Sequence, residues 1–196
     1  MARGSLLVIA CGALAHELVA LKQANGWNHL EIQCLPAELH NRPERIPGAV
    51  RDKLEAARET HDRVFVAYGD CGTGGLLDRV LAEYGAERIP GAHCYQFFGG
   101  EAFDRLQDEE PGSFYLTDFL LRHFDRLIWR GMGIDRHPSL LSTYFGNYRR
   151  LVYLAQFEAP ERIEQARAVA ARLGLDFVYR HTGYGELRRS LSRFVV

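Results

Sequence analysis

Long hydrophobic runs and an excess of one charge are both missing from this sequence. No apolar stretch reaches the ~18 residues that a membrane-spanning helix needs, so we expect no membrane partner. The formal net charge is only −1, which gives no general electrostatic reason to expect nucleic acid as a partner. The first residues lack the longer apolar region and small-residue cleavage site of a secretory signal, and we therefore expect a cytoplasmic protein.

Cysteines are few and widely spaced, which argues against two common cysteine-based architectures. There are four in 196 residues, and without a secretory signal they do not suggest a disulfide framework. No C-x-x-C pair is present, so the local spacing of a zinc ribbon is absent. The remaining roles are buried apolar filler, metal ligand and reactive thiol. Cys34 lies inside an apolar run and is expected to be core filler.

What the sequence does contain is an alternation of strand-type and helix-type segments. Hydrophobic residues make up 47% and charged residues 25%, as in ordinary globular proteins. The β-α-β-α rhythm predicts an α/β fold, a parallel-sheet, Rossmann-like layered sandwich with right-handed crossovers. We expect either a single domain over 1–196 or two small α/β halves, 1–110 and 111–196. Residues 129–148 show no clean period.

The expected elements follow from apolar periodicity and from Gly and Pro punctuation. Strands are expected at residues 6–10, 30–35, 64–68, 89–98, 151–155 and 175–179, with a terminal strand at 193–196. Helices are expected at 13–24, from Pro43 or Pro47 to 60, and at 76–84, 101–108, 113–128, 160–173 and 184–192.

Three cysteines follow strand-type runs. Cys11 follows the first expected strand, Cys71 lies in the glycine-rich turn after the third, and Cys94 follows residues 89–93. Because the carboxyl ends of parallel strands share one edge of a sheet, we expect these thiols to converge. Convergent thiolates bind zinc or an iron–sulfur cluster, since both favour soft sulfur donors. A fourth position would take water, substrate or a histidine, His40 or His93.

The glycine-rich turn after the third strand has a second interpretation. Its backbone amides would cradle a phosphate-bearing cofactor at the start of the next helix. The residues concerned are Gly69, Asp70, Gly72, Thr73 and Gly74. The turn matches neither G-x-G-x-x-G nor the Walker A motif, and no lysine follows it. The glycines would alternatively serve turn geometry alone, with Thr73 capping the helix.

A set of short motifs resembles an uncharacterised family, a domain of unknown function of methanogenic archaea and various bacteria. The motifs are Ala10-Cys11-Gly12-Ala13, Leu39-His40, Tyr68-Gly69-Asp70-Cys71-Gly72, His93-Cys94 and Tyr115-Leu116-Thr117. The likeness extends from Leu6 to about Leu191. In methanogens the family is often encoded near corrinoid-dependent methyltransferases. The resemblance implies that the cysteines bind a metal, such as zinc that activates a thiol for methyl transfer.

Two functions are therefore left open. The first is a metal-binding protein with zinc or an iron–sulfur cluster on Cys11, Cys71, Cys94 and His40. It would be a metal-dependent transferase or accessory protein that acts on a small molecule or with a corrinoid protein. The second is a metal-free module that binds a small molecule or phosphate and has structural cysteines. The aromatic middle region, 129–148, is compatible with a homo-oligomer and equally with core burial.

Overall fold

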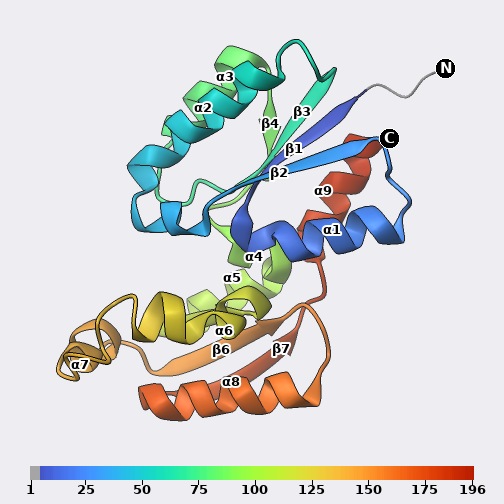
Figure 1. Cartoon of the computed structure of the whole chain (residues 1–196). Helices are drawn as coiled ribbons and strands as arrows, with labels where there is room; N and C mark the ends of the chain where they lie inside the picture. The colour runs from blue at the N-terminus through green and yellow to red at the C-terminus, as the bar shows by residue number, and fades with distance from the viewer. Residues whose placement is uncertain (1–4) are drawn as a thin grey trace. The chain divides into compact units, whose positions relative to one another are not determined.

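Two parallel β-sheets organise the structure, a computed structural model that describes residues 5–196 (Figure 1). The predicted α/β class with parallel sheets is confirmed. Internal contacts divide the chain into two compact units. The first runs to Phe97 and takes in Glu186–Val196, and the second is Phe98–Gly185. The division lies at Phe98 and not at residue 110, where the sequence suggested two halves, because Phe103 packs against Tyr115 of the second unit. The last helix joins the first unit because Phe194 packs against Phe65.

The first unit contains a four-stranded sheet in the order β2-β1-β3-β4, and every neighbouring pair is parallel. The central strand β1 pairs with β2 on one side and β3 on the other, so its six residues are all buried. The elements are β1 (Leu6–Cys11), α1 (Ala15–Ala24), β2 (Leu30–Leu35), α2 (Ile46–Ala57), β3 (Arg63–Ala67), α3 (Leu76–Tyr84), β4 (Glu87–Arg88), α4 (Cys94–Gly99) and α9 (Gly185–Val195). Short 3-10 turns occupy Gly12–Leu14, Ala37–Asn41 and Pro43–Arg45.

Helices cover both faces of this sheet (Figure 1). Alternation along β1 places Leu7, Ile9 and Cys11 on the face that α2 and α3 cover. On the other face lie α1 and α9, and the ring of Phe65 in β3 lies 5.2 Å from the ring of Phe194 in α9. The result is a helix–sheet–helix sandwich in which Cys11 faces the α2 and α3 layer.

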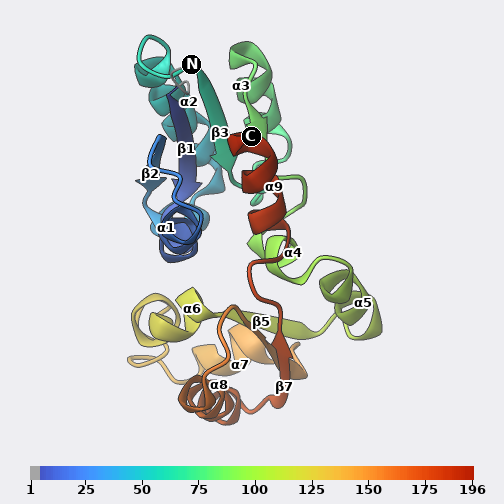
Figure 2. The same cartoon turned by 90° about the vertical axis from the view of Figure 1, so that its right-hand side faces the viewer.

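The second unit contains a three-stranded parallel sheet in the order β5-β6-β7. Leu151 and Tyr153 in β6 share a core with α6 and α8. On the opposite face, the ring of Phe103 in α5 lies 4.6 Å from that of Tyr115, so helices flank this sheet as well (Figure 2). The elements are α5 (Glu101–Glu109), β5 (Ser113–Thr117), α6 (Asp118–Arg122), a π-helical turn (Asp125–Trp129), α7 (Leu140–Phe145), β6 (Arg150–Ala155), α8 (Pro160–Leu173) and β7 (Asp176–His181).

The helix α8 has the bounds that the sequence predicts. Pro160 occupies its first turn, where a missing N–H costs nothing, and Gly174 ends it with φ of 72°. Its buried residues, Ala166, Ala170 and Leu173, recur at helical spacing. With 14 residues, α8 falls short of a bilayer crossing. No helix within residues 5–196 is both long and apolar enough to cross a membrane.

Two expected elements are wrong because strand pairing, which local sequence does not determine, decides both. Residues 113–117, expected to start a helix, form β5, which pairs with β6 from Arg150 onward. Aromatic residues suit a half-buried strand, and the Thr117 side chain then accepts from Leu120 N at 3.3 Å to start α6. Residues 89–98, expected as a strand, instead become a loop and α4.

The last residues form a helix where a terminal strand was expected. Residues 193–195 belong to α9, and Leu187, Leu191 and Phe194 are buried at helical spacing. The expectation for Cys34 is also wrong: it lies on β2, the edge strand of the first sheet, and is exposed. The run around it is only half buried because one side of β2 has no neighbouring strand.

Candidate functional site

Cys11 is the last residue of β1, and its sulfur is tied into the following turn. The Sγ atom accepts a hydrogen bond from the Ala13 amide at 3.3 Å and thereby caps the 3-10 turn. A glycine follows it for a steric reason, since a Cβ at Gly12 would lie 3.0 Å from the carbonyl oxygen of Leu35. The close approach of Gly12 to Leu35 therefore restricts the backbone after β1. The hydrogen bond from Ala13 orients the thiol. The thiol is buried, with Cys11 only 4% exposed.

The glycine-rich turn brings a second chain segment against Cys71. A Cβ at Gly69 would lie 2.9 Å from Cα and N of His93, so only glycine admits this approach. The amides of Asp70 and Cys71 donate to the carbonyl oxygens of Gly91 and Ala92, at 3.0 and 2.7 Å. These contacts join the loop after β3 to the segment that leads directly into Cys94.

Cys71 itself adopts an uncommon backbone conformation. Its φ is 51°, the left-handed region that costs side-chain-bearing residues about 1–2 kcal/mol. No other non-glycine residue in the described part of the chain has a positive φ. A residue held in such a conformation at a strand end marks a candidate functional position.

The carboxylate of Asp70 stabilises this loop through hydrogen bonds from residues of the loop itself. It accepts hydrogen bonds from the Thr73 hydroxyl at 2.8 Å, from Gly75 N at 2.8 Å and from Gly74 N at 3.2 Å. The amides that would cradle a phosphate thus already bind a carboxylate of the same loop. The phosphate-binding role of this turn stays a prediction, and an anion there would have to displace Asp70. Thr73 is 4% exposed and serves the loop.

The thiols of Cys11, Cys71 and Cys94 interact electrostatically. Burial is the main reason that the pKa of Cys11 is raised to about 12, and the charge of Cys71 adds to the rise. Burial also raises the pKa of Cys94, followed by the charges of Cys11 and Cys71. The pKa of Cys71 is raised by burial and, to a smaller extent, by the charge of Asp70. The fold therefore gathers the three thiols and leaves all of them protonated near neutral pH.

His40 lies beside Cys11, with its Nδ1 3.6 Å from the Cys11 sulfur and 3.2 Å from the carbonyl oxygen of Ala37. Burial lowers the pKa of His40, so the ring is neutral near pH 7. Donation from Nδ1 to Ala37 would leave the lone pair of Nε2 free to bind a ligand. The imidazole ring stacks on Tyr68 at 6.2 Å, with the ring planes 14° apart.

Tyr68 is a site residue that the sequence reasoning missed. It is 1% exposed, and its hydroxyl has no hydrogen-bond partner of standard geometry within residues 5–196. Burial raises the pKa of Tyr68, and the charges of Cys11 and Cys71 add to the effect, which places the hydroxyl among the thiols. Its position at the end of the third strand, directly before Gly69, was the available signal.

Glu17 is a buried carboxylate close to the cysteine cluster. It is 1% exposed on α1, and its charge contributes to the raised pKa of Cys94. In the part of the chain that the structure describes, no three His, Cys, Asp or Glu side chains form a ready metal-binding group. The structure thus gathers Cys11, Cys71, Cys94 and His40 in one region, and their role as ligands stays a prediction.

Fold and site together define an α/β protein with parallel sheets whose thiols gather at the carboxyl edge of the first sheet. A family described as protein of unknown function (DUF1638) matches residues 34–191. This match covers more than half of the chain, and the chain belongs to that family. The predicted membership of a domain-of-unknown-function family is thereby confirmed. No curated protein matches the chain.

Proposed function

We propose that the chain binds a soft metal ion, with zinc as the first choice, through Cys11, Cys71 and Cys94 and with His40 as the fourth ligand. The observations that support this are the 3.6 Å contact between His40 Nδ1 and the Cys11 sulfur and the hydrogen bond from the Cys71 amide to Ala92, two residues before Cys94. The charge of Cys71 also adds to the raised pKa of both Cys11 and Cys94. One buried and two partly buried thiols can ionise together only if a cation compensates their charges, which a thiolate-bound metal does. Sulfur and imidazole are also the donors that zinc prefers in proteins.

The same pKa values argue against a free reactive thiol. With a pKa of about 12, the Cys11 thiol would be ionised only to the order of 10⁻⁵ at pH 7. Reactive cysteines instead have a lowered pKa, produced by a cation or a helix N-terminus. We therefore propose that the thiols of this cluster are ionised only when a metal ion is bound to them.

Metal binding requires side-chain movement at the cluster. Because no three donors form a ready group within residues 5–196, at least one ligand side chain, a cysteine or His40, must change its rotamer on binding. Such a rotation moves the donor atom and leaves the backbone contacts of the loop in place. Tyr68 lies beside Cys11, and its hydroxyl would donate to the thiolate of the loaded site.

Elemental analysis of protein purified without oxygen tests this proposal. We expect about one zinc per chain in the wild type, a large loss in Cys71→Ser, and no loss in Cys34→Ser. Cys34 is the matched control because it is an exposed cysteine on the edge strand of the same sheet. Several irons per chain and a brown colour would instead show that the same thiols bind an iron–sulfur cluster. A wild-type protein with neither metal, and with no thermal stabilisation by added zinc, would refute the metal site.

Thiol alkylation of the native protein provides a second readout. Metal-bound thiols are protected and become reactive when a chelator is added, whereas buried structural thiols stay protected in both conditions. We expect the chelator to expose Cys11, Cys71 and Cys94 and to leave the alkylation of Cys34 unchanged. Mass spectrometry of the alkylated peptides distinguishes the four sites.

We also propose a cellular setting for the site. A bound zinc with an open or exchangeable position supplies a Lewis acid or activates a thiol. The resemblance to a family encoded near corrinoid-dependent methyltransferases favours a transferase or accessory role in the cytoplasm. A small molecule or a corrinoid protein would then be the partner. Reduced methylation of a thiol substrate by a Cys71→Ser protein, with Cys34→Ser unaffected, is the expected result.

A further inference from the structure

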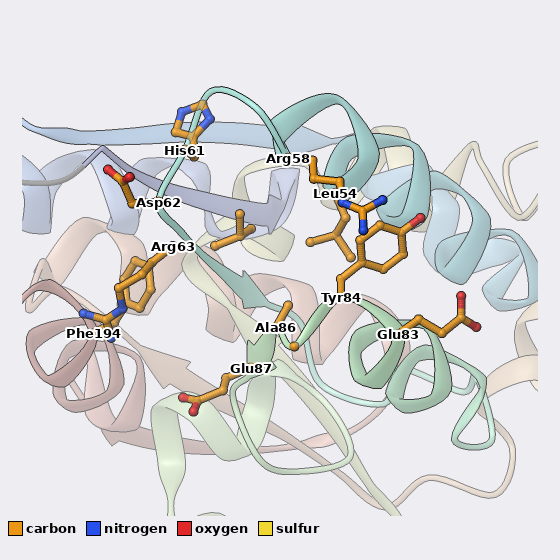
Figure 3. A pocket seen from close by; sticks show the side chains of 12 residues that line it. Leu54, Arg58, His61, Asp62, Arg63, Glu83, Tyr84, Ala86, Glu87 and Phe194 are labelled. Carbon is orange, nitrogen blue, oxygen red and sulfur yellow. The ribbon is translucent and has the colours of Figure 1, made fainter.

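One arginine outside the cysteine cluster contacts the chain segment that connects two of the proposed ligands. Arg88 is the last residue of β4, and its side chain is 16% exposed. The residue before it, Glu87, lines a pocket of about 340 Å³ together with Ala86 and Phe194 (Figure 3). Successive side chains of a strand point to opposite sides, and the guanidinium of Arg88 lies instead at the loop that follows β4.

The guanidinium of Arg88 donates hydrogen bonds in two directions. Its Nε and Nη2 atoms bind the two carboxylate oxygens of Asp78 in α3, the second at 3.0 Å. Its Nη1 atom donates to the carbonyl oxygen of Ile89 at 2.9 Å and to that of Gly91 at 3.2 Å. The paired contact with Asp78 therefore orients the planar group, and the planar group in turn holds the two carbonyl groups.

The contact with Gly91 is transmitted to Cys71 through the backbone. The carbonyl oxygen of Gly91 also accepts from the amide of Asp70 at 3.0 Å. The next carbonyl oxygen, that of Ala92, accepts from the amide of Cys71 at 2.7 Å. Cys94 follows Ala92 by two residues. The segment 89–92 thus holds the backbone of one proposed ligand and leads directly into another.

Cys71 depends on such support because of its backbone conformation. A residue with a φ of 51° keeps this conformation only where the surrounding structure enforces it. The charge of Arg88 acts in the same direction as its hydrogen bonds. Burial raises the pKa of Cys71, and the charge of Arg88 offsets part of this rise.

We propose that Arg88 is a positioning residue of the metal site, which holds the segment 89–92 and thereby places Cys71 and Cys94 for metal binding. This inference rests on the proposed metal site. Arg88 does not touch the metal but acts through the carbonyl groups of Ile89 and Gly91. Its removal leaves every ligand in the chain and lowers the affinity, because the ligands must then be ordered when the metal binds. Groups that hold the ligands of a metal typically contribute about tenfold to hundredfold to its affinity.

Cobalt(II) titration of the metal-free full chain, carried out without oxygen, tests this role. Thiolate ligands give cobalt a charge-transfer absorption whose intensity rises with the number of bound thiolates. We expect Arg88→Met to bind cobalt about tenfold to hundredfold more weakly than the wild type and to reach the same intensity at saturation. Cys71→Ser, which removes a ligand, should lower the intensity at saturation.

Arg88→Lys separates position from charge. A lysine keeps the positive charge but cannot pair with Asp78 and hold two carbonyl groups at the same time. We therefore expect Arg88→Lys to bind cobalt nearly as weakly as Arg88→Met. Wild-type affinity in Arg88→Lys would assign the effect to charge alone and would overturn the positioning role.

Two variants control for the loss of an ion pair and for the loss of stability. Arg51 pairs with Glu83 of α3 at 2.8 and 3.0 Å, and Glu83 lines the pocket of Figure 3. Arg51→Met therefore removes the same kind of pair from the same helix. Val80 is 5% exposed on α3, and Val80→Ala lowers the stability of the first unit by removing buried methyl groups. Both variants are expected to keep the cobalt affinity of the wild type.

Amide hydrogen exchange of the metal-free protein gives a readout that does not depend on the metal. Exchange at Asp70 and Cys71 should be faster in Arg88→Met and unchanged in Arg51→Met. A wild type that binds neither cobalt nor zinc would refute the metal site, and this inference with it. If the wild type binds cobalt, the role of Arg88 alone is overturned by an undiminished affinity or unchanged exchange in Arg88→Met. Equal weakening in Arg51→Met or Val80→Ala would also overturn it.

Discussion

Removal of the Asp118 carboxylate is expected to destabilise the second unit strongly. Asp118 is the first residue of α6 and is 2% exposed. Its carboxylate accepts from the hydroxyl of Tyr153 at 2.6 Å, from the amide of Phe157 at 3.2 Å and from Arg162 at 2.9 Å. This carboxylate links β5, β6 and α8 at one point of the fold.

The magnitude follows from the donors that a truncation leaves behind. In Asp118→Ala the Tyr153 hydroxyl and the Phe157 amide lose their acceptor, at about 1–3 kcal/mol each. Arg162 is 30% exposed and can turn to water, so it adds less. We expect a total of about 3–5 kcal/mol, the range for breaking a buried pair. Asp118→Asn keeps the shape and one acceptor, and its cost should be about half as large.

Urea unfolding measured by fluorescence reports this unit when Trp27 is replaced by Phe. Trp129 is then the remaining tryptophan, and it lies in the second unit under the guanidinium of Arg172, 3.5 Å from the ring centre. Glu164→Ala is the control, because it breaks an exposed ion pair on α8 and should cost less than about 1 kcal/mol. Equal costs for Asp118→Ala and Glu164→Ala, or for Asp118→Ala and Asp118→Asn, would refute the reasoning.

Two further predictions concern the first unit. In metal-free protein, Cys71→Gly should be about 1 kcal/mol more stable than Cys71→Ala, because glycine tolerates the φ of 51° at this position; equal urea midpoints would contradict it. The hydrogen bond from Arg88 lowers the pKa of Asp78, so this carboxylate stabilises the fold above its unfolded pKa of about 4 and loses that effect as the pH falls through the folded value. Asp78→Asn should therefore be less stable than wild type at pH 6, and the difference should shrink as the pH falls through the lowered pKa of Asp78. A difference that stays constant throughout the acid range would count against the assignment.

Local sequence signals were sufficient to predict those helices and strands whose first and last residues are marked in the sequence itself. The strand at 30–35 and the helices at 76–84 and 160–173 have the predicted bounds, since apolar runs, Pro160 and Gly174 mark them. The strand at 113–117 was not predictable in this way. Its stability comes from pairing with Arg150–Leu154, and that partner is far away in the sequence.

The candidate site likewise has features that the sequence predicts and features that it does not. Parallel topology was enough to expect the thiols after β1 and β3 to converge, because strand ends share an edge. The contact of His40 with Cys11 and the burial of Tyr68 depend on the path of a loop and on side-chain rotamers, which no periodicity encodes. The role of Asp70 inside its own loop was equally hidden, since a carboxylate beside glycines suits both ligand binding and turn closure.

The membership of α9 in the first unit has a consequence for the order in which the protein can fold. The first sheet is made early in translation, yet the helix that places Phe194 against Phe65 begins only at Gly185. Until then one face of β3 remains uncovered, while the second unit, which is continuous in sequence, already has its whole core. During synthesis the inserted second unit is therefore ready to fold before the first sheet, whose strands are made earlier, receives its last helix.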